Sequence, residues 1–430
     1  MAENGNDESN GAVEERDELT GALADIFLRV RKSLIASEPG GAASSDVSVQ
    51  GGERIYVPEG PQLYDGTSGI ALFLAAYHYA TNNQDARDLA LRSAARLRFA
   101  IKQSATAASL ARQSGNGTGG LAGVGSLPYA FVHLAAWLKV PEFIDAAREV
   151  ATNIMPEQIM AEERLDVMRG CAGTLLALLS FIEEVTAMGM DCGIAPDLAL
   201  LCGRRLLEKR ISYNSGPRAW SAGDSLPLSG FAHGAAGIAY ALVRLFQYTG
   251  QEEFRDAAIE GFAFERTLYI PELQTWFDPR CNLPLSKASW CEGAPGVALG
   301  ILGSMIAIDS HALRHDLEQA LSITRMLPEG PVDHLCCGNF GRVEIMNIAG
   351  SVLGRLQLTA HARQLATQLL ARAATSGFRF QPIDHQPSLP DMSENNPSLF
   401  LGLAGVGYTL LRLNYPDLFP SVLLLDTIVL

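Results

Sequence analysis

Residues 234–246 read GAAGIAYALVRLF, a Gly-x-x-Gly pair that leads directly into an apolar helical run. The same pattern occurs seven times along the chain, at intervals of 45 to 64 residues. Its copies are Gly66–Gly69, Gly120–Gly123, Gly170–Gly173, Gly234–Gly237, Gly293–Gly296, Gly338–Gly341 and Gly402–Gly405. One such pair would mean little, but recurrence at these intervals is typical of a structural repeat.

A second kind of helical segment alternates with the glycine pairs, with apolar residues on one side and charged residues on the other. We expect these segments at 17–36, 85–103, 141–154, 195–210, 252–269, 312–327 and 362–374. The runs after the glycines are apolar nearly all round, which is typical of buried helices, whereas one-sided helices lie at a surface. Strand signals are limited to Arg54–Val57 and Arg379–Gln381. The sequence therefore predicts an all-α fold, an α/α toroid of seven inner and seven outer helices.

Composition narrows the class of protein. The net charge of −14 argues against a nucleic-acid partner, because such proteins usually carry a basic face. Residues 1–16 are polar and acidic and do not resemble a signal peptide, so we expect a disordered acidic tail followed by a single domain over 17–430. No apolar run approaches the roughly 20 residues of a membrane span. Seven unevenly spaced cysteines indicate a reduced, cytoplasmic protein.

Three cysteines occupy related positions in the repeats. Cys291 and Cys336 each stand two residues before the first glycine of their copy, and Cys337 follows Cys336. Because the glycines should open every inner helix at the same end of the ring, we expect the three thiols to meet there. Buried cysteines also serve as small apolar residues or redox pairs. The shared register favours one Zn²⁺ ion per chain, held by three thiolates with the fourth position open, as in catalytic zinc sites.

Other polar residues precede the glycines at the same end. His233 is the candidate acid or base. Asp166 either hydrogen-bonds this histidine or a substrate, or caps the helix that follows it. Asp65 and Glu292 are carboxylates that face the same mouth, as solvated groups or hydrogen-bond anchors. Trp290 is expected to pack beneath the site.

Several motifs resemble those of the lanthipeptide cyclase (LanC-like) family, and especially the cyclase portion of class II lanthipeptide synthetases. They are GFAHGAAG at 230–237, SWCEGAPG at 289–296 and LCCGN at 335–339, with LYDGTSGIALFLAA and SLFLGLAGVGYTLLRL towards the two ends. The resemblance implies an α/α toroid whose zinc ligands are Cys291, Cys336 and Cys337. Relatives more often have histidine at the third position, so the chain resembles the smaller three-cysteine subgroup. The resemblance also implies that His233 is the catalytic histidine and Asp166 its conserved-type aspartate.

The chain departs from the family pattern at two neighbouring positions. Glu292 stands where relatives often have tyrosine or histidine, and Lys287 stands where they have arginine. The roles of these positions around the metal are therefore left open.

The reaction implied by the resemblance is the addition of a peptide cysteine thiol to a dehydroalanine or dehydrobutyrine in the same peptide. The implied partners are a dehydrated precursor peptide with its leader and a dehydratase domain or protein. One alternative is a zinc protein of the same family that binds glutathione or a peptide thiol without catalysis. Another is a sugar-processing α/α barrel that uses Asp65, Asp166 or Glu292 as paired carboxylates, but it leaves the three cysteines unexplained.

Overall fold

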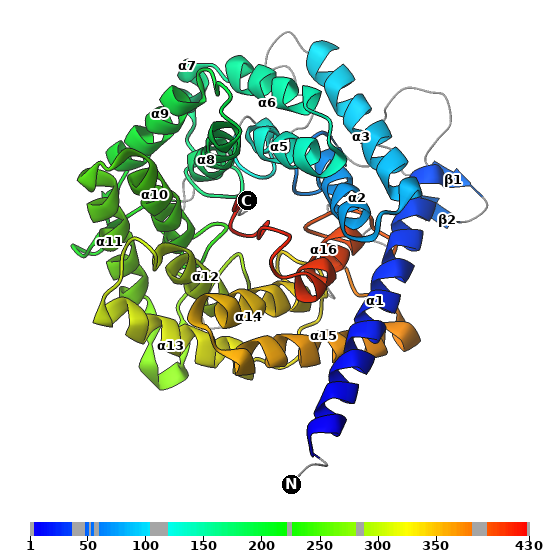
Figure 1. Cartoon of the computed structure of the whole chain (residues 1–430). Helices are drawn as coiled ribbons and strands as arrows, with labels where there is room; N and C mark the ends of the chain where they lie inside the picture. Colours follow the sequence, from blue (N-terminus) through cyan, green and yellow to red (C-terminus); the bar gives the residue numbers. More distant parts are fainter. Residues whose placement is uncertain are drawn as a thin grey trace.

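The computed structural model describes residues 4–36, 48–50, 53–55, 60–103, 119–221, 226–280, 288–380 and 394–427. Two concentric rings of helices surround a common centre (Figure 1). The inner helices are α2 (Thr67–Thr81), α5 (Leu127–Leu138), α8 (Cys171–Ala187), α10 (Ala235–Thr249), α12 (Ala294–Ser304), α14 (Asn339–Leu353) and α16 (Leu403–Asn414). The outer helices are α1 (Asn4–Ala36), α3 (Gln84–Gln103), α6 (Glu142–Asn153), α9 (Ala195–Glu208), α11 (Glu252–Thr267), α13 (His311–Met326) and α15 (Leu356–Ser376). The predicted toroid of seven inner and seven outer helices is confirmed.

The two ends of the chain close the ring. Six inner helices pack against the outer helix that follows them in sequence, whereas the last inner helix, α16, packs against α1. α16 also contacts α2 and α14. Because α1 begins at Asn4, its backbone extends into the segment for which the sequence favours a disordered acidic tail. That expectation stays a prediction.

Short elements complete the fold. They are α7 (Pro156–Ala161), the 3₁₀ turns η1 (Val124–Ser126) and η2 (Pro271–Leu273), and three antiparallel strand pairs. The pairs are β1 (Ser48–Gln50) with β2 (Glu53–Ile55), β3 (Ile211–Ser212) with β4 (Arg218–Ala219), and β5 (Tyr269–Ile270) with β6 (Thr275–Trp276).

The predicted strand signals have different outcomes. β2 overlaps the signal at Arg54–Val57, of which residues 56 and 57 lie outside the described residues. The prediction at Arg379–Gln381 is wrong for residues 379 and 380, and Gln381 lies outside the described residues. The backbone of Arg379 bonds to Asp333 instead of to a neighbouring strand.

The glycine pairs open the inner helices because the preceding chain crosses very close to each helix start. The first glycine directly precedes α2, α8, α10, α12, α14 and α16. A Cβ at the second glycine of the fourth copy, Gly237, would lie 1.9 Å from the carbonyl oxygen of Phe231. In the sixth copy, a Cβ at Gly341 would lie 2.2 Å from that of Leu335. Only glycine leaves room for such a crossing.

The second copy departs from this pattern. Its glycines precede the 3₁₀ turn η1, and α5 begins only at Leu127. Pro128 lies in the first turn of α5, where its fixed φ angle and missing N–H suit a helix start. The expectation that glycines open the inner helix in every copy is therefore wrong for this copy.

Backbone hydrogen bonds link the loops before the inner helices into a chain around the mouth of the ring, which we call the backbone belt. Six of the seven loops donate to the next one. The bonds run from Tyr64 N to Leu121 O (3.2 Å), Leu121 N to Val167 O (3.3 Å), Val167 N to Ala232 O (3.1 Å), Ala232 N to Trp290 O (3.4 Å), Cys336 N to Phe400 O (3.0 Å) and Phe400 N to Tyr64 O (2.9 Å). The belt therefore fixes the relative height of the loops that carry the candidate site residues.

One junction lacks such a bond. The loops 288–293 and 332–338 are neighbours in the ring and are fully described, yet no backbone hydrogen bond joins them. We call this junction the seam. It lies between α12 and α14, which pack against each other.

The C-terminal segment of the chain occupies the centre of the ring (Figure 1). After α16, the chain turns inward, and its described end lies in the middle of the ring (Figure 1). Residues 422–425 are buried there. The Asp426 carboxylate accepts a hydrogen bond from Tyr240 Oη (2.9 Å) and pairs with Arg244 (3.3 Å). No helix in the described ranges combines the length and the apolar character needed to cross a membrane.

Candidate metal centre

Three thiols from the two sides of the seam lie together. The Sγ atoms of Cys291 and Cys336 are 3.0 Å apart, those of Cys336 and Cys337 are 3.3 Å apart, and those of Cys337 and Cys291 are 3.2 Å apart. Cys291 and Cys336 are buried, whereas Cys337 is exposed. All three cysteines are free. The sequence register that pairs Cys291 with Cys336 thus corresponds to a physical cluster.

The geometry and chemistry of this cluster fit one soft metal ion. Among the described His, Cys, Asp and Glu side chains, these three form the group whose ligand atoms converge closely enough to share an ion. A tetrahedral zinc ion with Zn–S bonds of about 2.3 Å holds its sulfurs roughly 3.8 Å apart. The three sulfurs would therefore move apart only slightly on binding an ion. The exposed thiol of Cys337 would stay open to the mouth.

The three thiols differ in their tendency to ionise. Hydrogen bonding to the sulfurs of Cys291 and Cys336 lowers the pKa of Cys337 well below the ordinary thiol value. Hydrogen bonding to Cys336 raises the pKa of Cys291, and burial raises that of Cys336. Cys337 is therefore the first thiolate to form, and a cation is needed to keep all three ionised side by side.

Tyr64 adds a hydroxyl to the cluster that sequence reasoning did not assign to the site. Its Oη lies 3.1 Å from Cys336 Sγ. The Tyr64 ring stacks on Phe400, with centroids 5.2 Å apart and planes at 22°. Burial raises the pKa of Tyr64 well above its ordinary value, so the hydroxyl keeps its proton and acts as the donor. Its position in the repeat could have identified it, because Tyr64 also stands two residues before the first glycine of its copy.

His233 and Asp166 form a hydrogen-bonded pair beside the thiols. The distance from His233 Nδ1 to Asp166 Oδ2 is 2.7 Å. The other carboxylate oxygen, Oδ1, accepts a hydrogen bond from the backbone N–H of Arg169 at 2.7 Å. Asp166 therefore supports the turn before α8 and contacts the histidine at the same time. The backbone N–H of His233 lies 3.5 Å from the carbonyl oxygen of Cys291, next to the cluster.

The Asp166 carboxylate also sets the protonation of His233. Burial alone lowers the pKa of a histidine, because it disfavours the charged ring. In His233 the hydrogen bond and the charge of Asp166 outweigh burial, and the pKa is raised above its ordinary value. Smaller contributions come from Glu292 and Cys337. The histidine is therefore suited to carry a proton near neutral pH and to deliver it from Nε2.

Glu292 is engaged by an arginine that the sequence did not suggest. Its carboxylate pairs with Arg280, which also pairs with Asp278 at 2.7 Å. Glu292 Oε2 is buried and has no hydrogen-bond partner among the described residues. Arg280 belongs to the long loop before α12, where spacing offers no signal. Lys287, the neighbouring departure from the family pattern, lies outside the described residues.

The two remaining candidates flank the site. Trp290 is buried, and its ring centroid lies 5.2 Å from that of Phe400 and 6.0 Å from that of Phe231. Asp65 accepts a hydrogen bond from Gln62 at 2.8 Å, and burial raises its pKa. Trp290 thus contributes packing between loops of three repeats, while Asp65 contacts its own loop.

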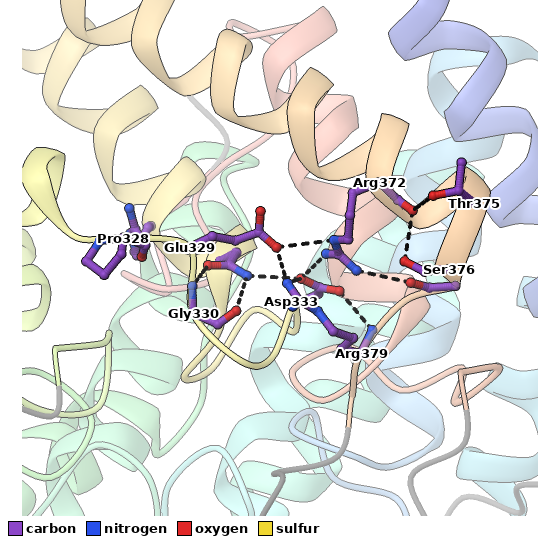
Figure 2. Close-up of polar contacts among 11 residues, drawn as sticks. Pro328, Glu329, Gly330, Asp333, Arg372, Thr375, Ser376 and Arg379 are labelled. Carbon is purple, nitrogen blue, oxygen red and sulfur yellow. Dashed lines mark hydrogen bonds and ion pairs between the residues drawn. The ribbon is translucent and has the colours of Figure 1, made fainter.

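A buried carboxylate anchors the loop that carries Cys336 and Cys337 (Figure 2). The fully buried Asp333 carboxylate accepts hydrogen bonds from Arg372 (2.5 Å), Asn339 Nδ2 (3.0 Å) and the backbone N–H of Arg379 (2.8 Å). Glu329 pairs with both arginines. Because Arg372 belongs to α15, this network ties one side of the seam to the outer ring.

A second carboxylate anchors the loop that carries His233. Glu265 of α11 is buried, and its Oε1 accepts hydrogen bonds from the backbone N–H groups of Gly230 (3.0 Å) and Ala236 (2.7 Å). Burial raises the pKa of Glu265 to about 8. A side chain of an outer helix thus supports both loops: Arg372 supports the loop of Cys336 and Cys337, and Glu265 supports the loop of His233.

The chain is similar to one known protein family and to several solved structures. Residues 57–424 match the family described as "Lanthionine synthetase C-like protein". Among solved structures, the chain is similar to nisin cyclase, with a TM-score of 0.62 and 16% identity over 84% of this chain and 90% of that one. It is also similar to an unsaturated glucuronyl hydrolase specific for heparin (TM-score 0.41, 12% identity, 71% and 84% covered) and to a sugar epimerase from a ruminal bacterium (TM-score 0.46, 11% identity, 94% and 100% covered). No curated protein sequence matches the chain.

Proposed function

Because the chain belongs to the lanthionine synthetase C-like family, we propose that it is a zinc-dependent lanthipeptide cyclase. The substrate is a dehydrated precursor peptide with its leader, which a dehydratase supplies. The observation that carries this proposal is the cluster of three Sγ atoms within 3.3 Å of one another, next to the His233–Asp166 pair. A reducing, cytoplasmic location is part of the proposal, because the three thiols must stay reduced.

Cys291, Cys336 and Cys337 are the residues that would hold the zinc ion. Soft thiolates suit Zn²⁺, and three protein ligands leave one position for a substrate thiol. Bound there, the ion would lower the pKa of a coordinating thiol, so that a peptide thiolate would be available as the nucleophile at neutral pH. Four thiolates would exceed the charge of Zn²⁺ by two, so each sulfur would be more electron-rich than in a site with a histidine ligand.

His233 supplies the proton that completes the addition. The peptide thiolate forms a C–S bond to the β-carbon of the dehydro residue, and the electron pair of the double bond moves to give an enolate. Protonated His233 then delivers its proton to the α-carbon. Asp166 engages Nδ1 and keeps the ring charged, so that Nε2 is free to act as the acid. The thiol releases its proton to solvent, and His233 regains a proton from solvent after it delivers its own, so the addition is balanced overall.

The reaction is tested with a synthetic dehydrated peptide that contains cysteine. The purified, zinc-loaded chain is incubated with the peptide, remaining thiols are alkylated, and the products are weighed by mass spectrometry. Ring formation protects the thiols, and a sample without protein measures spontaneous cyclisation. Complete alkylation with zinc present would reject the cyclase and favour the thiol-binding alternative.

Two variants separate metal binding from catalysis. His233→Ala is expected to keep the metal and to lower the cyclisation rate by roughly 10²–10⁴-fold, as for other general acids. Cys291→Ala is expected to lose the metal, whereas Cys192→Ser, outside the cluster, is expected to keep it. Metal analysis of the three proteins checks these assignments, and a parent chain that binds no zinc would reject the proposal.

A further inference from the structure

We propose that Tyr64 is a positioning residue of the metal centre: its hydroxyl donates a hydrogen bond to the Cys336 thiolate and reduces the electron density that this sulfur gives to the metal. The inference rests on the proposed function, because it requires the three cysteines to be ligands. It adds a residue from the first repeat to a centre built by the fifth and sixth.

The structure holds the Tyr64 hydroxyl in place in two independent ways. The backbone belt connects Cys336 to Phe400 and Phe400 to Tyr64, with N···O distances of 3.0 and 2.9 Å. The rings of Tyr64 and Phe400 stack, with centroids 5.2 Å apart. Backbone position and ring orientation are thus both determined, and they place Oη 3.1 Å from Cys336 Sγ.

The chemistry of the two groups gives the bond its direction. A phenol hydroxyl has one proton to donate, and a thiolate can only accept. Bonds of this charge-assisted kind are stronger than those between neutral groups. Groups that bond to metal ligands in this way commonly change metal affinity, because they tune the donor strength of the ligand.

The hydrogen bond from Tyr64 matters because the centre contains so many thiolates. A centre with three protein thiolates and a substrate thiolate carries excess negative charge, and the hydroxyl of Tyr64 offsets part of it at Cys336. Phe400 stands at the same position of its repeat and offers no proton. The Tyr64–Cys336 contact therefore makes Cys336 a weaker donor than it would otherwise be.

The test uses the full chain, freed of metal and loaded with Co²⁺ as a spectroscopic substitute for zinc. Tyr64→Phe removes only the hydroxyl and keeps the ring that stacks on Phe400. The control is Tyr269→Phe, which also removes a hydroxyl with one side-chain hydrogen bond, to Gln319, from a ring packed on Trp276. The readouts are the sulfur-to-cobalt charge-transfer band and the Kd for Co²⁺.

For Tyr64→Phe we expect a shift of the charge-transfer band to lower energy, because the Cys336 thiolate becomes a better donor. We also expect a roughly tenfold change in Kd, the scale usual for residues that support metal ligands. Tyr269→Phe should leave both unchanged. Identical spectra and Kd values for Tyr64→Phe and the parent would overturn the proposal and make Tyr64 a packing residue.

A second substitution covers the case in which Tyr64→Phe fails to fold. Replacing Tyr64 by 3-fluorotyrosine keeps the shape and strengthens the donor, so the band should move to higher energy. A shift in the same direction as for Tyr64→Phe, or no shift, would contradict the proposal. A parent chain that binds no Co²⁺ would instead reject the proposed function, so the two failures are distinguishable.

Discussion

The backbone belt and the seam join neighbouring loops of the ring in different ways. Around the mouth, loops of successive repeats are joined by main-chain hydrogen bonds, as between Ala232 and Trp290 or between Cys336 and Phe400. At the seam, the two facing loops share no main-chain bond, and the thiols of Cys291, Cys336 and Cys337 meet instead. One junction of the ring thus depends on side-chain chemistry.

The difference indicates how a closed ring can carry a reactive centre. Main-chain bonds need no particular side chain, so they hold the mouth together whatever the loops display. A junction without them leaves space and freedom for side chains that bind an ion. In the proposed holoenzyme, the metal is both the reactive centre and the link across the seam.

Metal removal is expected to have the largest effect. Zinc at about a thousand times its Kd should stabilise the chain by roughly 4 kcal/mol, because it binds only the folded form. This stabilisation should be concentrated at the seam. When the metal is removed by a chelator, hydrogen exchange should therefore become faster in α12 and α14 by a larger factor than in α2 and α5. Thermal unfolding and hydrogen exchange measure the two effects, and equal changes in all four helices would contradict a link at the seam.

Loss of the Asp333 carboxylate should weaken one side of the seam. Asp333→Ala leaves Arg372 without its buried partner, and breaking such a pair costs about 3 kcal/mol. Asp309→Ala, which breaks an exposed pair with Arg314, should cost under about 1 kcal/mol. Denaturant unfolding measures the loss of stability in each variant. Zinc affinity is measured as well, and it should fall for Asp333→Ala alone. Equal costs would show that Asp333 does not anchor the loop.

On the belt side, Glu265 should make stability depend on pH. Its pKa is about 8 in the folded chain, because of burial and, to a smaller extent, the charge of Asp316, against roughly 4.3 when unfolded. The folded state therefore binds the proton more tightly, so stability is highest below the unfolded pKa and falls as pH rises towards 8. Glu265→Gln keeps an oxygen that can accept from Gly230 and Ala236, but its side-chain amide does not ionise in this pH range.

The measurement is denaturant unfolding of parent and Glu265→Gln at pH 5 and pH 8. From pH 5 to pH 8, the free energy of unfolding of the variant should rise by about 2 kcal/mol relative to that of the parent. This value is a discounted share of the full linkage free energy. Parallel pH profiles for the two proteins would show that Glu265 does not titrate in this range.

Exchange of one ligand should have the smallest effect. Cys337→His keeps a metal-binding side chain but lowers the negative charge of the centre, so the substrate sulfur becomes less reactive. We expect cyclisation a few-fold slower and limited to fewer peptides, on the scale of ligand tuning. Rates on a panel of dehydrated peptides measure this. Faster cyclisation of every peptide by Cys337→His would refute the role given to the third thiolate.

The repeated glycine pairs made the ring predictable, because each copy pairs an apolar helix with a one-sided one. The same register placed Cys291 and Cys336 at equivalent positions. It could not show that α5 starts late, because that depends on η1 and Pro128. Nor could it show that Arg280 pairs with Glu292, since a long loop carries no periodicity from which to infer a contact.

The amino-acid sequence by itself determined the number of repeats, their inner and outer helices and the end of the ring at which the thiols stand, because these depend on local patterns repeated along the chain. Only the tertiary structure decided which loops bond to each other, that the junction at the thiols lacks main-chain bonds, and that Tyr64 reaches Cys336. The contact between Tyr64 and Cys336 alone joins residues 272 positions apart. These contacts depend on how the ring closes, which no local pattern encodes.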